Sequence, residues 1–428
     1  MSEPTRPSRD AASLIFNLPD YRVIDAIELP DGRRRIEVES LEPVGCPACG
    51  VVAERVHSRR RQRVRDVPVA GRIEVVWRKR RWFCDEARCD RGTFAEWTEQ
   101  VPRRARSTAR LRGALLAAVV ESGRAASEAA RAHGVSWWLV QAAVTAAVVL
   151  LPDVDARPVA RLGIDEHRYR SVRFFREPSG AWRRFEPWMS TIVDIDTGHV
   201  LGVVDGRDSA AIGAWLQQRS EAWRDAVQVV AIDPSAAFRK ALREHLPRAA
   251  VSVDPFHLVK LGNDMLTTVR QRLAREQKQR RGRLIDPSWA NRKLLLRGAD
   301  TLTDRGWTRL RAVFASDDPT DELGAAWGVK EHLRILLRSG SLAEAHDAKM
   351  RLGLAVIAAD MPETSRLFDT ICAWWDAIEV FIITGATNAR TEAANTSIKQ
   401  IKRTGRGFRN EANYRARILL RSAARTAA

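Results

Sequence analysis

The stretch Val227-Gln228-Val229-Val230-Ala231-Ile232-Asp233 decides the fold of this chain. Its β-branched residues, bounded by turn residues, are typical of a buried strand, and the strand ends in a carboxylate. Pro234 and a helical stretch follow at once. Ligands and metals bind at the strand ends of open α/β sheets. A single acid in this position more commonly caps the next helix, so Asp233 alone does not define a site.

Two further acids indicate that Asp233 belongs to a functional site. Arg161-Leu162-Gly163-Ile164-Asp165 is another short strand that ends in a carboxylate, and Glu392 lies far downstream in a helical stretch. Mg²⁺ prefers hard oxygen ligands, and a pair of such ions activates water for in-line phosphoryl transfer. We therefore predict that Asp165, Asp233 and Glu392 are catalytic and hold two Mg²⁺ (or Mn²⁺) ions in one active site.

The segments around these acids predict a ribonuclease H-like α/β core. Beyond the two acid-bearing strands, we expect strands over residues 188–195, 199–204 and 250–254, and helices over residues 209–223 and 236–246. This β-β-β-α-β-α-β order is that of the ribonuclease H-like fold, in which the first-strand and fourth-strand acids lie side by side.

The basic residues 258–380 are expected to form an all-helical insertion before the helix that carries Glu392. A tryptophan of this insertion could stack on a flipped base. Core packing is the simpler role for each of Trp289, Trp307 and Trp327.

The charge of the chain indicates a polyanionic partner. The 428 residues contain 71 Lys and Arg against 53 Asp and Glu, a net charge of +18, which favours nucleic acid over a membrane surface. The longest apolar stretch, residues 142–151, is too short to span a bilayer, so we expect no membrane partner. No secretory signal is evident, so we expect a cytoplasmic bacterial protein that is nucleoid-associated when bound.

Four of the five cysteines form two pairs near the N-terminus: Cys46 with Cys49, and Cys84 with Cys89. In the cytoplasm such pairs indicate a metal rather than disulfides. Two knuckles joined by a β-like stretch predict a zinc ribbon, in which all four thiolates hold one structural Zn²⁺ tetrahedrally. Four unrelated buried thiols are the alternative.

Basic residues crowd this module. Arg78, Arg80 and Arg81 lie between Trp77 and Trp82, and we predict that these arginines contact DNA phosphates. A merely solvated charged face is the alternative.

Residues 126–141 fit a helix-turn-helix. Small Ala130 lets two helices approach, Gly134 makes the turn, and Ser136 caps the second helix. An ordinary αα-hairpin is the alternative. If the motif reads DNA, the contacting side chains are those at the start of the second helix: Ser136, Trp137, Trp138 and Gln141.

The helix that carries Glu392 also carries cations. Asn395, Lys399, Lys402 and Arg403 recur with Glu392 at helical spacing on one face, so the three cations are predicted to bind a DNA backbone beside the metal ligand. The Ala/Arg-rich tail, residues 421–428, is expected to fray.

Taken together, these motifs resemble the zinc-ribbon ISL3 family of bacterial insertion-sequence DDE transposases. The most specific segments are residues 388–410 and Asp254-Pro255-Phe256-His257, because in related transposases the His257 position supports the active site. One departure is Ala393, where the family often has glycine. The resemblance implies Mg²⁺-dependent strand cleavage and strand transfer by a DDE two-metal mechanism. Its implied partners are terminal inverted repeats and target double-stranded DNA, and we expect a homodimer on DNA.

Two other classes remain open. A non-catalytic zinc-ribbon/helix-turn-helix DNA-binding regulator, descended from a domesticated transposase, would not need the three acids. A Mg²⁺-dependent nuclease would share the acids without needing two DNA-reading modules.

The expected organisation is therefore multidomain. It comprises a β-hairpin region (1–40), a zinc ribbon (41–100), a helix-turn-helix region (101–151), the first part of the ribonuclease H-like core (158–257), the helical insertion (258–380) and the catalytic helix with a basic tail (381–428).

Overall fold

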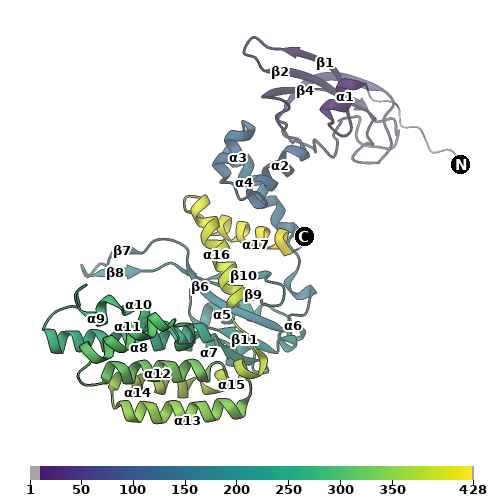
Figure 1. Ribbon diagram of the computed structural model, residues 1–428. Helices are drawn as coiled ribbons and strands as arrows, with labels where there is room; N and C mark the ends of the chain where they lie inside the picture. The colour runs from purple at the N-terminus through teal and green to yellow at the C-terminus, as the bar shows by residue number, and fades with distance from the viewer. Residues whose placement is uncertain (1–9, 427–428) are drawn as a thin grey trace. The chain divides into compact units, whose positions relative to one another are not determined.

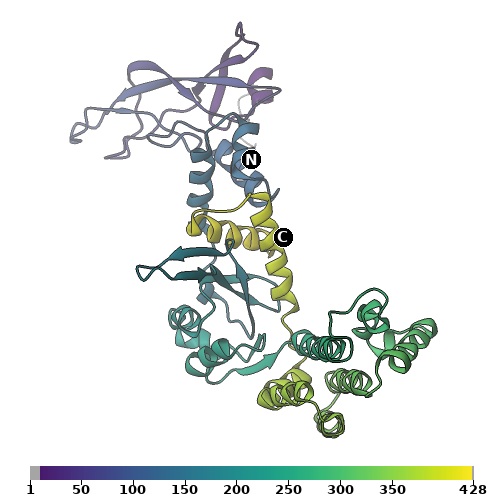
Figure 2. The ribbon, with the colours of Figure 1, turned by 90° about the vertical axis from the view of Figure 1, so that its left-hand side faces the viewer.

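The computed structural model describes residues 10–426 of the chain (Figures 1 and 2). The chain divides into two compact units. The first contains residues 1–151 together with residues 400–428, and the second contains residues 152–399.

The first unit begins with a five-stranded sheet. The strands follow the order β1-β2-β4-β3, and β5 pairs with β4. The hairpin predicted near the N-terminus is confirmed, and its second strand pairs in parallel with β4, so the hairpin and the strands between the cysteine pairs share one sheet. The elements are α1 (Ala11–Phe16), β1 (Tyr21–Glu28), β2 (Arg34–Ser40), β3 (Val56–Val64), β4 (Ile73–Phe83) and β5 (Thr93–Ala95).

The two tryptophans of β4 are buried in two separate clusters. Trp77 is fully buried and packs edge-on against Tyr21, with 5.5 Å between ring centroids. Trp82 is buried with Cys46 and Phe94 under the cysteine knuckles. Both tryptophans therefore belong to the core, and the Arg80 guanidinium lies over the Trp82 ring at 4.7 Å from its centroid.

Three helices follow the sheet: α2 (Ala109–Val120), α3 (Ala126–His133) and α4 (Trp137–Ala147). They enclose a small core of Leu111, Leu115 and Val140 with other apolar residues. Helix α4 ends at Ala147, and a 3₁₀ turn, Val148–Leu150, follows it.

One apolar stretch in the described part of the chain, Trp137–Ala156, is long enough to cross a membrane by length and composition. It contains α4, two 3₁₀ turns and Pro152, and Val140 and Val144 of this stretch pack against α2. A core helix passes the same test, so the stretch is weak evidence for a membrane.

The expectation that the C-terminal tail frays is wrong for the residues that the structure describes. Helix α17 (Glu411–Thr426) packs on α2 and α4, and its Leu420 is buried in their core. Arg417 donates to the carbonyl oxygens of Gly123 and Arg124 at 2.9 and 2.7 Å. Tyr414 and Ile418 are buried and lie one helical turn apart, which is the sequence pattern of a packed helix. The high arginine content of the tail obscured this pattern.

The second unit is built on a mixed sheet of order β10-β9-β6-β11-β12. The β10/β9 and β9/β6 pairs are antiparallel, whereas the β6/β11 and β11/β12 pairs are parallel. All five expected strands are present: β6 (Arg161–Arg168), β9 (Trp188–Asp194), β10 (Val200–Asp205), β11 (Val229–Ile232) and β12 (Ala250–Val253).

The two faces of this sheet bury different residues. Leu162 and Ile164 of β6, with Val230 and Ile232 of β11, lie in the main core, which also contains Phe238. Ala231 packs in a second cluster on the other face. The helices between the strands are α5 (Ser209–Gln217), α6 (Glu221–Ala226) and α7 (Ala236–His245). The single helix expected over residues 209–223 is thus divided, because Ser220 caps a new helix.

Strand β6 does not end at Asp165 as expected. Its parallel pairing with β11 stops at Ile164, but its antiparallel pairing with β9 continues to Arg168. The chain then forms a hairpin that was not predicted from the sequence, β7 (Arg173–Arg176) with β8 (Trp182–Phe185). Every residue of both strands is exposed.

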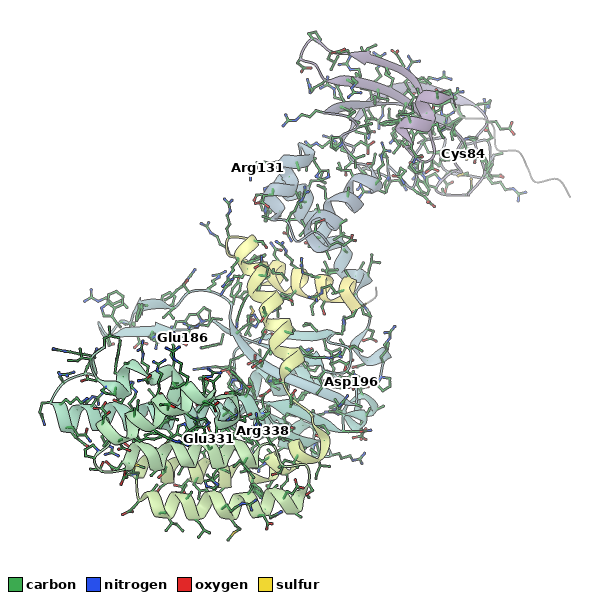
Figure 3. The ribbon with its side chains drawn as sticks, in the orientation of Figure 1. Cys84, Arg131, Glu186, Asp196, Glu331 and Arg338 are labelled. Carbon is green, nitrogen blue, oxygen red and sulfur yellow. The ribbon has the colours of Figure 1, made fainter. Side chains whose placement is uncertain are left out.

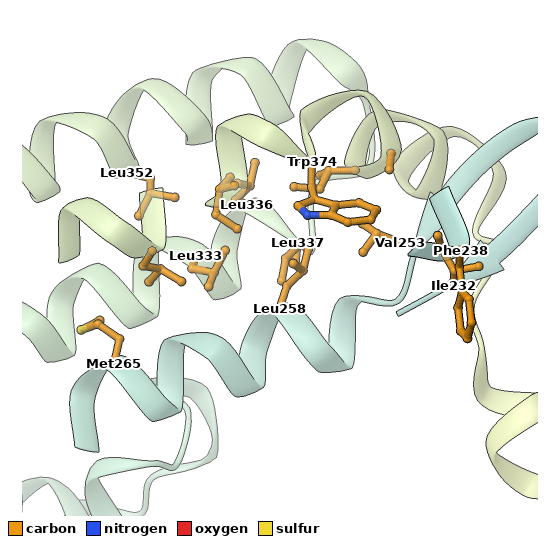
Figure 4. Close-up of a cluster of buried hydrophobic side chains, with 14 of the residues drawn as sticks. Ile232, Phe238, Val253, Leu258, Met265, Leu333, Leu336, Leu337, Leu352 and Trp374 are labelled. Carbon is orange, nitrogen blue, oxygen red and sulfur yellow. The ribbon is translucent and has the colours of Figure 1, made fainter. Parts of the chain in front are cut away.

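The expected helical insertion is confirmed as helical, and its first helix, α8 (Pro255–Lys278), begins early enough to include His257. Figure 4 shows Leu258 and Met265 of α8 beside Leu333, Leu336 and Leu352 in the buried cluster. The following elements are α9 (Pro287–Ala290), α10 (Arg292–Leu295), α11 (Asp304–Asp317), α12 (Glu322–Leu336), α13 (Leu342–Ala359), α14 (Pro362–Ala373), α15 (Trp375–Thr384) and α16 (Ala389–Thr404).

Candidate active site and zinc centre

The four predicted zinc ligands converge. The sulfur atoms of Cys46, Cys49, Cys84 and Cys89 all lie within 4.8 Å of one another, and Cys84 is labelled in Figure 3. The Sγ atoms of Cys46 and Cys89 are 3.9 Å apart, and those of Cys49 and Cys84 are 3.6 Å apart. A tetrahedral ion with Zn–S bonds of about 2.3 Å requires edges of about 3.8 Å. This cluster therefore fits a structural Zn²⁺.

Backbone geometry sets the first cysteine knuckle. The Cys46 carbonyl accepts a 2.8 Å hydrogen bond from the Gly50 N–H, and Gly50 has a left-handed φ of +79°. A side chain on Gly45 would lie 2.6 Å from the Gly50 carbonyl oxygen. Both glycines are thus needed for the tight return of the chain between the two thiolates.

The three arginines predicted to contact DNA from β4 differ in what they already bind. Arg80 is largely buried, and its Nε lies 2.9 Å from the carboxylate of the fully buried Glu96. Arg78 pairs with Glu37 at 3.1 Å, and Arg81 donates to the Thr93 hydroxyl. Arg80 therefore stabilises the sheet, whereas Arg78 and Arg81 keep exposed side chains.

The residues predicted to read DNA lie at the start of α4. Gly134 adopts a φ of +64°, and the Ser136 hydroxyl accepts from the Leu139 N–H at 3.3 Å. Trp138 is 76% exposed and Trp137 is 39% exposed, with 5.0 Å between their ring centroids. Gln141, one turn further along the same helix, is half-buried. The two adjacent rings form an exposed aromatic surface at the start of the helix.

The strand register brings Asp165 and Asp233 together. Ile164 of β6 pairs in parallel with Ile232 of β11, so the two aspartates follow at equivalent positions on neighbouring strands. Both occupy the sheet face opposite Leu162, Ile164 and the main core. Glu166 lies on the other face, and its carboxylate is 3.7 Å from Arg207.

Helix α16 lies against these strands at a point where β6 has no side chain. A Cβ atom on Gly163 would lie 2.0 Å from the Thr391 hydroxyl oxygen and 2.8 Å from the Asn388 side-chain oxygen. Thr391 and Asn388 are both fully buried. Gly163 thus permits the close approach of the helix to the sheet.

Two asparagines of this segment hold the aspartates. The Asn395 amide donates to Asp165 Oδ2 at 2.6 Å. The Asn388 amide donates to the Ile164 carbonyl at 3.0 Å and to Asp233 Oδ1 at 3.3 Å. The sequence reading placed Asn395 on the catalytic helix but did not assign this role.

A buried chain of hydrogen bonds supports Asn395 from behind. The Thr191 hydroxyl contacts the Asn395 side-chain oxygen at 2.9 Å and His167 Nδ1 at 3.0 Å. Thr191 lies opposite Asp165 in the β6/β9 register. Sequence alone gives no signal for this chain, because it depends on a strand register and a helix more than two hundred residues apart.

His257 and Asp254 lie at the start of α8, on the Asp233 side. His257 Nδ1 is 3.1 Å from Asp233 Oδ1, although the two groups do not meet with hydrogen-bond geometry. Asp254 accepts from the Phe256 N–H and, with its other oxygen, from the Asn388 N–H, both at 2.8 Å. Asp254 therefore connects α8 to the segment that carries Glu392.

Glu392 lies on α16 between Asn388 and Asn395, and its side chain is half-buried. Of the residues that the structure describes, only the four cysteines offer ligand atoms that all lie within 4.8 Å of one another. The structure thus brings Asp165 and Asp233 together and positions Glu392 on the helix that holds them, without the three carboxylates sharing one coordination sphere.

The electrostatics of the aspartate pair fit a divalent cation. Burial, followed by repulsion from Asp165, raises the pKa of Asp233 to about 7. No Lys or Arg within residues 10–426 forms an ion pair with either aspartate. Hard carboxylate oxygens with no cationic side chain between them are the donor set that Mg²⁺ prefers.

Other predicted residues lie outside this group. Lys399 and Arg403 are exposed and Lys402 is half-buried. Trp307 and Trp327 pack against the main core, with 5.4 Å between their ring centroids.

Two family models match this sequence. A family model described as "Transposase" for the ISL3 group matches residues 162–418. A second model, described as the zinc-finger of transposase IS204/IS1001/IS1096/IS1165, matches residues 42–89.

Two curated relatives have similar sequences. The transposase for insertion sequence element IS1001 of Bordetella parapertussis is 25% identical over 319 residues, which cover 71% of this chain and 74% of that protein. The transposase for insertion sequence element IS1557 of Mycobacterium tuberculosis is 25% identical over 304 residues, covering 64% and 67%.

One solved structure, the Drosophila P element transposase strand transfer complex, matches with a TM-score of 0.38 and 10% sequence identity. The match covers 73% of this chain and 91% of that chain.

A zinc-ribbon module and a transposase segment in one chain define an insertion-sequence transposase. Because the transposase model spans more than half of the 428 residues, the chain belongs to the ISL3 transposase family. The family resemblance drawn from the sequence is confirmed.

The zinc centre is tested by metal content. Purified protein should contain about one zinc per chain, and Cys84→Ser/Cys89→Ser should lose it, because two thiolates cannot retain the ion. Cys372→Ser, at the exposed fifth cysteine, is the matched control and should keep full zinc content. Unchanged zinc in the double variant would contradict the site.

The close approach at Gly163 is tested by adding one methyl group. Gly163→Ala should displace α16, lower the free energy of unfolding by about 1–3 kcal/mol and reduce DNA cleavage. Gly328→Ala is the control, because nothing lies within 4 Å of that Cβ position on α12. Denaturation midpoints and plasmid cleavage are the measurements, and wild-type values for both in Gly163→Ala would contradict the docking argument.

Proposed function

We propose that this transposase cuts DNA at the terminal inverted repeats of its insertion element and joins the cut ends to target DNA. Asp165, Asp233 and Glu392 would hold two Mg²⁺ (or Mn²⁺) ions in a ribonuclease H-like core. The observation that carries the proposal is the aspartate pair on adjacent strands, with the Glu392 helix anchored to both through Asn395 and Asn388.

The chemistry of the proposal is two in-line phosphodiester substitutions, first by water and then by a DNA 3′-hydroxyl. When bound, the ions would stabilise the attacking and leaving oxygens alike. Asn395 fixes one oxygen of Asp165 at 2.6 Å. Asn388 and His257 approach the same oxygen of Asp233, at 3.3 and 3.1 Å, which leaves its other oxygen for a metal.

His257 is a positioning residue in this proposal. It lies beside Asp233 at the first turn of α8 rather than between the two aspartates. Lys399, Lys402 and Arg403 continue from Glu392 along α16 and would bind the DNA backbone next to the scissile phosphate.

Recognition of the element ends is assigned to the first unit. The α3–α4 pair would act as a helix-turn-helix, with Ser136, Trp137, Trp138 and Gln141 facing the DNA bases. Arg78 and Arg81 of β4 would contribute phosphate contacts, whereas Arg80 is committed to Glu96. Since two element ends must be joined, we further propose a homodimer on DNA.

The catalytic assignment predicts that Asp165→Asn, Asp233→Asn and Glu392→Gln each reduce cleavage of a supercoiled plasmid carrying the element ends by about 10³-fold or more. The reason is that each removes a charged ligand worth several kcal/mol of transition-state stabilisation. Binding of repeat DNA should persist in all three variants.

Glu379→Gln is the matched control, because Glu379 lies on α15 and pairs with His346 at 3.3 Å. Near-normal cleavage by Glu392→Gln would mean that the third ligand is misassigned. An intact plasmid with wild-type protein and Mg²⁺ would favour a regulator, and cutting without joining would favour a nuclease.

The recognition assignment predicts that Trp138→Ala weakens binding to repeat DNA by about tenfold while leaving binding to random DNA unchanged, because base contacts carry the sequence preference. Val149→Ala, an exposed apolar truncation just beyond α4, is the control. Mobility shift of the full chain at fixed salt measures both. An equal loss on repeat and random DNA would contradict base reading at this helix.

A further inference from the structure

A pocket of about 360 Å³ opens within the second unit, away from the aspartate pair. It lies between the C-terminal half of α8 and the segment that leads into α9. Its lining is basic and aromatic, and it contains no carboxylate: Arg270, Gln271, Arg275, Arg281, Gly282 and Trp289 contribute most of it.

Arg270 is the unusual member of this lining. Arg270 is only 8% exposed. No acid in the described part of the chain forms an ion pair or a hydrogen bond with its guanidinium. Burial, and then the nearby positive charge of Arg292, lower the pKa of the Arg270 guanidinium. Buried charges without a partner are rare because their desolvation is uncompensated.

Two other cations on the same helix, Arg272 and Lys278, have acidic partners, so the fold does not lack acids here. Arg272 contacts the carboxylates of Glu276, Glu322 and Glu363 at 3.2, 3.1 and 2.9 Å. Lys278 lies 3.1 Å from Asp286. Arg270 is buried and lines the pocket together with two exposed arginines, Arg275 and Arg281.

The part of the lining formed by Gly282 and Trp289 is held in place. The guanidinium of Arg292 lies over the Trp289 ring at 3.8 Å from its centroid. A Cβ atom on Gly282 would lie 2.7 Å from the Trp289 ring, so only glycine lets this segment pack on the indole. The pocket is therefore a shaped feature rather than a gap between mobile side chains.

We propose that this pocket binds a phosphate group of the DNA backbone. A phosphodiester supplies the anion that Arg270 lacks, and the exposed arginines at the mouth can share it by charge-assisted hydrogen bonds. The proposal rests on the proposed function in one respect, which is that the anion belongs to DNA.

The length of helix α8 sets the distance between this phosphate contact and the aspartate pair. His257, beside Asp233, and Arg270 are both on α8. The helix rise of about 1.5 Å per residue separates them by about 20 Å along its axis. With about 3.4 Å per base pair, the phosphate in the pocket would lie about six base pairs from the scissile phosphate. Such a contact would hold the duplex in register over the aspartate pair.

The first test measures stability without DNA or Mg²⁺. Arg270→Met keeps the apolar stem of the side chain but removes the buried charge, so the second unit should unfold at a higher temperature than in the wild type. Added inorganic pyrophosphate should raise the unfolding temperature of the wild type and have no effect on Arg270→Met. Arg305→Met, at an exposed residue of α11, is the matched control and should respond like the wild type.

The second test measures DNA affinity of the full chain as a function of salt. Arg270→Met should weaken binding by about tenfold and reduce the slope of log K against log salt by about 0.9, the effect of one lost phosphate contact. Arg281→Gln, which changes an exposed residue and leaves the fold intact, should reduce affinity and pyrophosphate response in the same direction.

Three outcomes would overturn the proposal. The first is a wild-type pyrophosphate response in both Arg270→Met and Arg281→Gln. The second is an Arg270→Met protein that is less stable than the wild type while its DNA affinity is unchanged. The third is a lost pyrophosphate response with an unchanged salt slope, which would assign the pocket to a free anion. Neither test involves cleavage, so failure here is distinguishable from failure of the catalytic proposal.

Discussion

The contact between helix α16 and strand β6 is the constraint on which the candidate active site depends. At Gly163 the helix approaches so closely that a methyl group would lie 2.0 Å from Thr391. That approach lets Asn395 and Asn388 reach the two aspartates from above while the main core supports the strands from below. The whole helical region, from α8 to α15, lies between these partners in the sequence. The packing of this helical region must therefore position α16 accurately enough for its hydrogen bonds to the aspartates to form.

Features that depend on residues close together in the sequence could be predicted, whereas those that depend on distant residues could not. The strands, the cysteine pairs and the acid positions could be predicted, because β-branched runs, ligand spacing and strand-end carboxylates are local patterns. The exposed β7–β8 hairpin was not predicted, since two four-residue strands with both faces in solvent leave no alternation of polar and apolar residues to detect. The structural role of Arg80 was also hidden, because its partner Glu96 becomes adjacent only when β4 and β5 pair. Asn388 and Asn395 stood in the recognised segment, but their acceptors lie more than 150 residues away.

The surplus of positive charge is distributed in two ways. Many arginines are neutralised within the fold, as Arg272 is by three carboxylates and Arg80 is by Glu96. Other arginines have no acidic partner. The lack of a partner is informative only for a buried arginine, because water solvates an exposed cation in any case. Counting arginines along the sequence cannot separate these groups. The positions of the acids in three dimensions do, and they single out Arg270 in the second unit.

The choice of amides around the aspartates follows from the same electrostatics. Asp233 already has a pKa raised to about 7 by burial and by Asp165, so a further carboxylate at position 388 or 395 would add repulsion at the same place. A lysine there would neutralise the pair and compete with a metal for the same oxygens. An asparagine donates a hydrogen bond, orients one oxygen of each aspartate and adds no charge. The amide anchors thus preserve the negative potential that a divalent cation requires, while fixing the carboxylates that would bind it.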